Sequence, residues 1–357
     1  MRKMIPLLLL PVLFISATQF TDSRNDDDPP PCKNEKLATS EPGTCLDPRA
    51  YRLLKAVDRV HESPYNNEFA KRLIDIIEPR VHKVVDTKVS HAAYDVPIRI
   101  YYPSRKCTMH PTHAIFFIHG GSFMYGSIEE YDMAVKKFAR ITDKIVVALD
   151  YRLAPEHPYP AALEDVEAVL DWIIDNRKEL GIAGDKITLL GDSAGANLAT
   201  VLAIKKRDAQ QDHISCQILY YPPTTFVEEE FPSRVHFLFD NKRTYILTEE
   251  LLRTTKKSYL PDSIPENDPY VSPLEADLSG NLPPALIITA QVDALRDDGR
   301  IYAEKLRKAG QDVTYIEYEG MIHGFMNFYM VLPEGKESMR EIRDYLTDMI
   351  SGTKGAE

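Results

Sequence analysis

The sequence predicts an α/β protein in which a mostly parallel central sheet has helices on both faces and a helical cap. Short continuous apolar runs alternate with helix-like stretches, and nearly every run ends in a polar or glycine-rich turn. Strands that are buried on both faces have this uniformly apolar character. An alternating strand begins near Val96, and the later strands are expected at 114–118, 144–149, 187–190, 214–220, 285–290 and 313–318.

Helix-like spacing of apolar residues fills the intervals between these runs. It predicts helices at 50–61 and 67–77 before the first strand, and at 163–176, 196–206 and 301–309 between later strands. The segment 221–284 is rich in proline and has little strand pattern, which indicates an insertion over one end of the sheet. We therefore expect N-terminal cap helices over 46–90, and a main α/β domain over 91–357 with a cap insertion at about 222–284.

The N-terminal residues 1–20 have the layout of a signal peptide. Two basic residues precede an apolar run at 4–15, and small residues follow at 16–18. The run is short for a membrane span, which needs about 20 apolar residues, so a cleaved signal is favoured over a retained signal anchor. A polar linker follows at 21–45. The chain is expected to be secreted or in the lumen of the secretory pathway, or else membrane-anchored with a lumenal catalytic domain.

The net charge of the chain excludes one class of binding partner. A net charge of -11 argues against nucleic acid as a partner, because phosphate binding needs a basic surface.

An oxidising compartment permits two disulfides among the four cysteines, with three possible pairings. The closeness of Cys32 and Cys45 favours that pair, and Cys107 and Cys216 are expected as free buried thiols. No metal-ligand spacing and no nucleotide-binding loop is present, so no metal and no cofactor is implied.

The first chemical motif is Gly191-x-Ser193-x-Gly195, which follows an apolar run and precedes a helix-like stretch. This is the pattern of a nucleophile elbow, in which glycines on each side of a strained serine let the helix pass close to the strand. Ser193 is the predicted nucleophile. A second run ends in His119-Gly120-Gly121, where bare backbone N–H groups suit a tetrahedral oxyanion. With the N–H of Ala194 they predict an oxyanion hole.

A nucleophilic serine needs a base, which in this strand–helix arrangement comes after the serine in the chain. Three histidines follow Ser193. His213 precedes a predicted strand and so lies at the wrong end of the sheet, and His236 lies in the insertion. His323 follows the last predicted strand between two glycines, which makes it the candidate base.

The base in turn needs an orienting carboxylate. Asp293 directly follows the strand predicted at 285–290 and is the favoured acid. Asp297 and Asp298 are rivals, but they lie at the expected start of the next helix. Acidic residues favour that position because of the helix dipole.

Together these segments resemble the hormone-sensitive-lipase-like family of α/β-hydrolases, which includes bacterial family IV esterases and arylacetamide deacetylases. The resemblance runs from about Val96 to the C-terminus in the family's order. It implies that Ser193, Asp293 and His323 form a catalytic triad and that Gly120, Gly121 and Ala194 supply the oxyanion N–H groups. The matching segments are His-Gly-Gly at 119–121, Asp-Tyr-Arg-Leu-Ala-Pro-Glu-His-Pro at 150–158, Gly-Asp-Ser-Ala-Gly-Ala-Asn-Leu at 191–198, Asp-Ala-Leu-Arg-Asp at 293–297 and His-Gly-Phe at 323–325.

The resemblance also assigns scaffold roles and shows two departures. His119 is implied to hold its loop, and Arg152 and Glu156 are implied to form a buried polar network. Ser122 stands where the family usually has glycine or alanine, which leaves the acyl preference open. Ala294 stands where proline is common.

The resulting prediction is a serine carboxylesterase that acts through an acyl-enzyme intermediate on short- to medium-chain or aryl esters. Two alternatives remain: an arylacetamide-type amide deacetylase, since the same residues serve both bonds, and a non-enzymatic small-molecule receptor on the same fold. A receptor of this kind usually lacks one of the three catalytic residues, and all three are present here. The expected partner is a small-molecule ester. Attachment to a membrane is expected only if the N-terminal anchor is retained. A homodimer is possible on this sequence.

Overall fold

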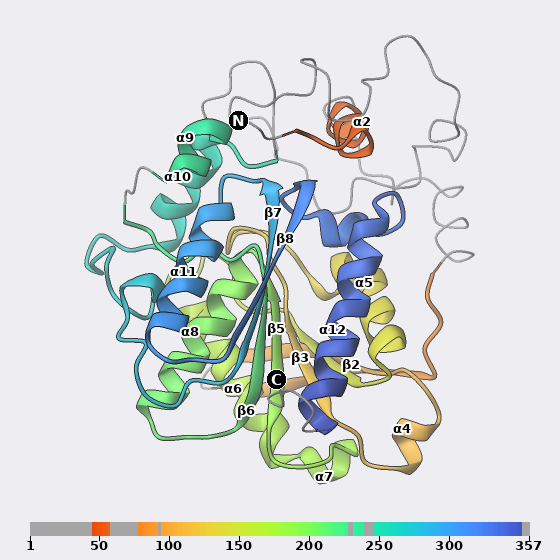
Figure 1. The fold of residues 1–357 in the computed structure, drawn as a ribbon. Helices are drawn as coiled ribbons and strands as arrows, with labels where there is room; N and C mark the ends of the chain where they lie inside the picture. The colour runs from red at the N-terminus through yellow and green to blue at the C-terminus, as the bar shows by residue number, and fades with distance from the viewer. Residues whose placement is uncertain (1–44, 58–77, 92–93, 228–230, 239–245, 352–357) are drawn as a thin grey trace.

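A single eight-stranded sheet forms the centre of the molecule in the computed structural model, which describes residues 45–57, 78–91, 94–227, 231–238 and 246–351 (Figure 1). The strand order is β1-β2-β4-β3-β5-β6-β7-β8. Only the pairs β1–β2 and β2–β4 are antiparallel, and every other pair is parallel. The strands are β1 (Lys83–His91), β2 (Tyr94–Tyr102), β3 (Ala114–Ile118), β4 (Ile145–Leu149), β5 (Ile187–Asp192), β6 (Ile214–Tyr220), β7 (Ala285–Val292) and β8 (Val313–Ile322).

Helices cover both faces of this sheet, as the sequence predicts. The set on one side is α6 (Ala161–Asp175), α8 (Ala194–Asp208) and α11 (Arg296–Lys308), and the set on the other is α5 (Ile128–Thr142) and α12 (Pro333–Ser351) (Figure 1). Phe116 packs into the core on the α6–α8–α11 side, and its neighbour Phe117 packs into the core on the α5–α12 side. Since successive strand residues point to opposite faces, the continuous apolar runs are explained by two cores.

The mostly parallel α/β architecture is therefore confirmed. The strands expected from Val96 onward all form, and the helices expected at 163–176, 196–206 and 301–309 correspond to α6, α8 and α11. Helix α2 (Pro48–Val57) matches the pattern that begins at residue 50, whereas the pattern at 67–77 lies outside the described residues. Two short helices, α4 (Lys106–Met109) and α7 (Arg177–Leu180), lie in connections.

The predicted boundary at residue 90 between the cap helices and the main domain is wrong. The sheet already begins at Lys83 with β1, inside the segment 46–90 that was expected to contain only cap helices. Strand β1 is an antiparallel edge strand whose residues are mostly exposed, so it lacks the apolar run that identified the other strands. Helices α5 and α12 were also not predicted.

The segment 221–284 contains helices and no strand among its described residues, as expected for an insertion. It carries α9 (Pro232–Leu238), α10 (Glu249–Tyr259) and a single 3₁₀ turn at Pro273–Glu275. Figure 1 shows α9 at the end of the sheet toward which β7 and β8 point.

The N-terminal predictions concern residues that the structure does not describe. The segments 1–20 and 21–44 lie outside it, and so does Cys32, so the Cys32–Cys45 pairing stays a prediction. No disulfide is found among the described cysteines, and Cys107 is a buried free thiol, as expected. Within the described residues, no helix combines the length and the apolarity that crossing a membrane requires.

Candidate functional site

The structure brings Ser193, His323 and Asp293 together at the carboxyl ends of three parallel strands. Ser193 follows β5, Asp293 follows β7 and His323 follows β8. The Nε2 atom of His323 lies 2.9 Å from Ser193 Oγ, and its Nδ1 atom lies 2.7 Å from Asp293 Oδ2. The three residues are 9%, 8% and 2% exposed in the order Ser193, His323, Asp293. Because a carboxylate only accepts hydrogen bonds, Nδ1 carries the proton, and Nε2 accepts from the serine hydroxyl.

The turn at Ser193 leaves no room for a side chain at the glycine on either side of it. Ser193 itself has a φ of 51° and a ψ of -121°, a strained conformation for a residue with a side chain. A Cβ on Gly191 would lie 2.3 Å from the carbonyl oxygen of Gly195, and a Cβ on Gly195 would lie 2.0 Å from that of Ile118. Only glycine lets α8 start this close to β3 and β5.

The structure separates Asp293 from its two rivals. Oδ1 of Asp293 accepts the N–H of Leu295 at 2.9 Å, which leaves Oδ2 facing His323. Asp297 and Asp298 lie in the first turn of α11, as expected. Their carboxylates do not reach the histidine. Asp297 accepts the N–H of Ser233, and Asp298 pairs with Arg234, so both bind the insertion instead.

The loop at 119–123, which we call the oxyanion loop after its predicted role, differs from the prediction at Gly120. The N–H of Gly120 donates to Asp192 Oδ1 at 2.8 Å, so it is already engaged and Gly120 is not an oxyanion donor. No acceptor in the described part of the chain takes the N–H of Gly121, Ser122 or Ala194. Gly121 has a φ of 115° and Ser122 a φ of 55°, a sharp turn that frees two successive N–H groups. The sequence signal for a donor at Ser122 is the family's preference for a small residue at this position.

Asp192 is a residue that the sequence reasoning missed. Its carboxylate is 1% exposed and accepts from the Gly120 N–H and, at 3.0 Å, from the hydroxyl of Tyr131 on α5. Burial raises the pKa of Asp192 to about 6, and the hydrogen bonds from Gly120 and Tyr131 oppose the rise. This side chain therefore joins β5, which ends beside Ser193, to the loop that carries Gly120.

His119 is buried beneath the same loop. Its Nδ1 atom lies 2.7 Å from the carbonyl oxygen of Gly120, and its ring stacks on Tyr151 with centroids 4.2 Å apart. Burial lowers the pKa of His119 to about 4, so the ring is neutral at physiological pH. These contacts fit the scaffold role that the resemblance implies.

The expected polar network around Arg152 is only partly present. Arg152 pairs with the fully buried carboxylate of Asp165 and also reaches Glu164. Glu156 is exposed, so its predicted place in a buried network was wrong.

The insertion packs directly on the oxyanion loop through aromatic rings. Phe123, which follows Ser122, stacks on Tyr259 of α10 with centroids 3.8 Å apart and an interplanar angle of 10°. Phe226 packs against both rings. Since Phe123 also has a positive φ of 57°, this stacking helps to hold a strained turn.

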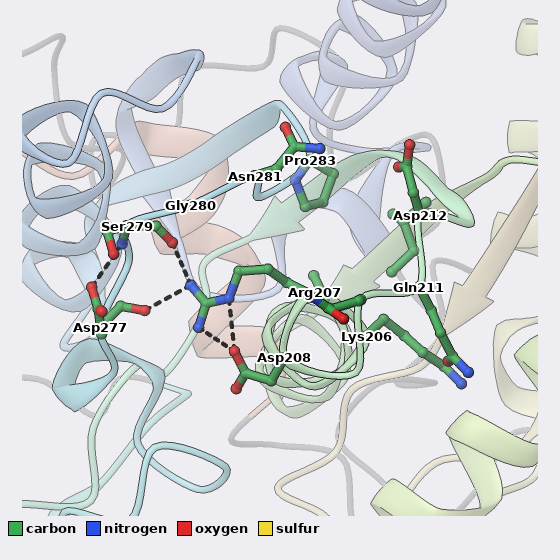
Figure 2. Close-up of a pocket in the computed structure, with 13 residues that line it drawn as sticks. Lys206, Arg207, Asp208, Gln211, Asp212, Asp277, Ser279, Gly280, Asn281 and Pro283 are labelled. Atoms are coloured by element: carbon green, nitrogen blue, oxygen red, sulfur yellow. Dashed lines mark hydrogen bonds and ion pairs between the residues drawn. The ribbon is translucent and has the colours of Figure 1, made fainter.

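A polar recess of about 480 Å³ lies at the opposite end of the sheet, near the starts of β6 and β7 (Figure 2). Arg207, in the last turn of α8, donates there to Asp208 and to the carbonyl oxygens of Asp277 and Ser279. No nucleophile–base pair lines it. No group of side chains within the described ranges is arranged to hold a metal ion.

Comparison with known proteins agrees with this geometry. A family model described as the α/β-hydrolase fold matches residues 115–327. The chain is 33% identical over 305 residues to the esterase LipI of Mycobacterium tuberculosis, covering 84% of this chain and 94% of that protein. It is 29% identical over 294 residues to human arylacetamide deacetylase-like 2, covering 66% and 72%. A solved esterase from Pyrobaculum calidifontis superposes with a TM-score of 0.75 at 35% identity, over 86% of this chain and 99% of that one.

Proposed function

This chain is a carboxylesterase of the hormone-sensitive-lipase-like family of α/β-hydrolases, and we propose that it cleaves short- to medium-chain or aryl esters with Ser193, His323 and Asp293. The observation that carries the proposal is the hydrogen-bonded series from Ser193 Oγ through His323 to Asp293. A buried serine, histidine and carboxylate in this order activate the hydroxyl for attack on a carbonyl carbon.

In the proposed first half-reaction, His323 Nε2 takes the proton of Ser193 as Oγ attacks the ester carbonyl. The oxyanion then accepts from the N–H groups of Gly121, Ser122 and Ala194. Each such donor contributes about 3 kcal/mol to lowering the barrier. His323, held by Asp293, gives the proton to the leaving alkoxide oxygen, and the alcohol departs from an acyl-Ser193 intermediate.

Water completes the cycle in the second half-reaction. His323 accepts a proton from the attacking water, the same three N–H groups receive the second oxyanion, and the proton returns to Ser193 as the carboxylic acid leaves. The buried position of all three side chains favours these steps, because hydrogen bonds to developing charge are stronger away from water.

The Ser193→Ala variant tests the proposal. It is expected to lose hydrolysis of a short p-nitrophenyl ester by at least about 10⁴-fold, as removal of such a nucleophile does elsewhere. Circular dichroism should show an unchanged fold. Turnover close to that of the wild type in Ser193→Ala would overturn the assignment.

Two further assays separate the alternatives. A fluorophosphonate should label wild type at Ser193, and absence of labelling would favour a receptor. A matched pair of an aryl ester and an anilide separates esterase from amide deacetylase, and we expect the ester to be hydrolysed faster.

A chain-length series of p-nitrophenyl esters, repeated with Ser122→Gly, tests whether Ser122 sets the acyl preference.

A further inference from the structure

The turn that carries Asp293 is bonded to the cap insertion through one buried serine. Ser233, at the start of α9, is 0% exposed. Its hydroxyl donates to the carbonyl oxygen of Ala294 at 2.9 Å and accepts the N–H of Asp297 at 3.2 Å. Its own backbone N–H donates to Asp297 Oδ2 at 2.9 Å. One residue of the insertion thus makes one hydrogen bond to the turn after β7 and two to the first turn of α11.

The peptide group between Ala294 and Leu295 connects this serine to the acid. Its carbonyl oxygen accepts from Ser233, and its N–H donates to Asp293 Oδ1 at 2.9 Å. A peptide group is planar and rigid, so fixing its carbonyl end also fixes the direction of its N–H. That N–H orients the carboxylate whose other oxygen lies 2.7 Å from His323 Nδ1.

A neighbouring ion pair shows that the contact is built into the fold. Arg234 donates to both oxygens of Asp298, at 3.0 and 2.6 Å, and also to the carbonyl oxygen of Thr225. Asp298 is fully buried, so the guanidinium balances a negative charge close to Asp293. Ser233 carries no charge, so a substitution that removes its hydroxyl should leave the local electric field almost unchanged.

We propose that Ser233 is a positioning residue, which holds the Asp293 carboxylate against His323 through the Ala294–Leu295 peptide. The proposal rests on the proposed function, in which Asp293 orients the base. It gives the insertion a second role. Besides packing on the oxyanion loop, the insertion keeps the acid in place, and the chemical step depends on α9 even for small esters.

Kinetics of Ser233→Ala test the proposal, with Ser338→Ala as the matched control. Ser338 is also 0% exposed and its hydroxyl also makes two hydrogen bonds, to Gly335 and from Tyr220. We expect Ser233→Ala to lower kcat about 10-fold with KM within about twofold, because alignment is lost and not binding. Ser338→Ala should lose comparable stability and keep kcat. Ser233→Cys, which retains size with a weaker donor, should fall between, and it replaces Ser233→Ala if that variant does not fold.

A double-mutant cycle with Asp293→Asn separates positioning from general destabilisation. If Ser233 acts through Asp293, Ser233→Ala should have almost no further effect on kcat in the Asp293→Asn background. The downfield proton resonance of His323 Nδ1–H should also move in Ser233→Ala and stay in place in Ser338→Ala.

The outcomes distinguish the two proposals. Additive losses of kcat, or an unchanged kcat and resonance in the Ser233 variants, would overturn the role of Ser233 and leave the triad intact. An unchanged kcat in Asp293→Asn alone would instead overturn the role of Asp293, and the positioning proposal would fail with it.

Discussion

At the carboxyl ends of its strands the sheet carries strained backbone and N–H groups that no described acceptor takes, whereas near the amino ends of β6 and β7 the side chains of Lys206, Arg207 and Asp212 form ion pairs. Ser122, Phe123, Ser193 and Tyr221 all have positive φ values at the first end. At the second end, Gln210 also has a positive φ, but it follows α8, where helices commonly terminate in this way.

Buried polar groups differ between the two ends in the same sense. Asp192 is buried, no cation among the residues that the structure describes bonds to it, and burial raises its pKa to about 6. Lys206, which lines the recess and is equally buried, has two carboxylates, those of Glu167 and Asp171, within ion-pair distance. Strained backbone and a buried charge without a counter-ion are typical of functional sites, where the surrounding structure stabilises them. At the amino ends of β6 and β7, where no such site is expected, the same fold pairs its buried charge.

The largest expected effect comes from removing the close approach at the strained end. Gly195→Ala would place a Cβ 2.0 Å from the backbone oxygen of Ile118, which cannot rotate away. We expect it to lower the free energy of unfolding by at least about 3 kcal/mol and to abolish esterase activity. Urea unfolding and p-nitrophenyl ester hydrolysis measure both.

Gly310→Ala isolates the opposite case, an unfavourable backbone conformation without a close contact. Gly310 has a φ of 82°, and nothing lies within 4 Å of its added Cβ. It should cost only about 1 kcal/mol and leave activity unchanged. Equal losses in the two variants would mean that the close contact at Gly195 costs no more than an unfavourable φ with open space around it, and the steric argument for the elbow would fail.

Asp192→Asn is expected to have opposite effects on stability and activity. The folded protein binds a proton at Asp192 with a pKa of about 6, against 3.8 for an ordinary aspartate, so above pH 6 the charged form destabilises the fold. A neutral amide should raise the free energy of unfolding at pH 8 by up to about 3 kcal/mol, and the gain should vanish toward pH 4. The titratable groups that act on this carboxyl are Tyr131, Tyr151, Tyr220, Tyr221 and His323.

Activity of the same variant should fall about 10-fold. The amide oxygen can still accept from Gly120, but its NH₂ group cannot accept the Tyr131 hydroxyl proton, so the loop is held less firmly. Tyr131→Phe should reproduce part of the loss in kcat without the pH-dependent gain. A variant that is both more stable and fully active would show that the buried carboxylate has no part in holding the loop.

The same contrast explains what could be predicted from the sequence. Ser193 and Asp293 follow the buried strands β5 and β7, and His323 follows the half-buried strand β8, so strand prediction placed all three at one edge of the sheet. The roles of Gly120 and Ser122 could not be separated in this way. Which backbone N–H is free depends on a side chain 72 positions away, Asp192, whose engagement with Gly120 appears only in three dimensions.

The missed elements have a related cause. Strand β1 exposes most of its residues, so no apolar run marks it, and its place is fixed by pairing with β2. The bonds of Ser233 to the acid turn join residues 61 and 64 positions apart, and nothing in the local pattern of α9 indicates them. Contacts between distant segments therefore account for most of what was not predicted.

The smallest expected effect tests the paired end. Arg207→Met removes the bonds of the guanidinium to the carbonyl oxygens of Asp277 and Ser279 and its ion pair with Asp208, while keeping much of the side chain's packing. The side chain is 15% exposed and its partners are accessible to water, so we expect a loss of about 1 kcal/mol in urea unfolding. Activity and KM should stay within about twofold, because no catalytic group touches this end. A change in kcat of fivefold or more, with the fold retained, would show that the two ends of the sheet are coupled. Activity would then depend on both ends and not on the carboxyl ends alone.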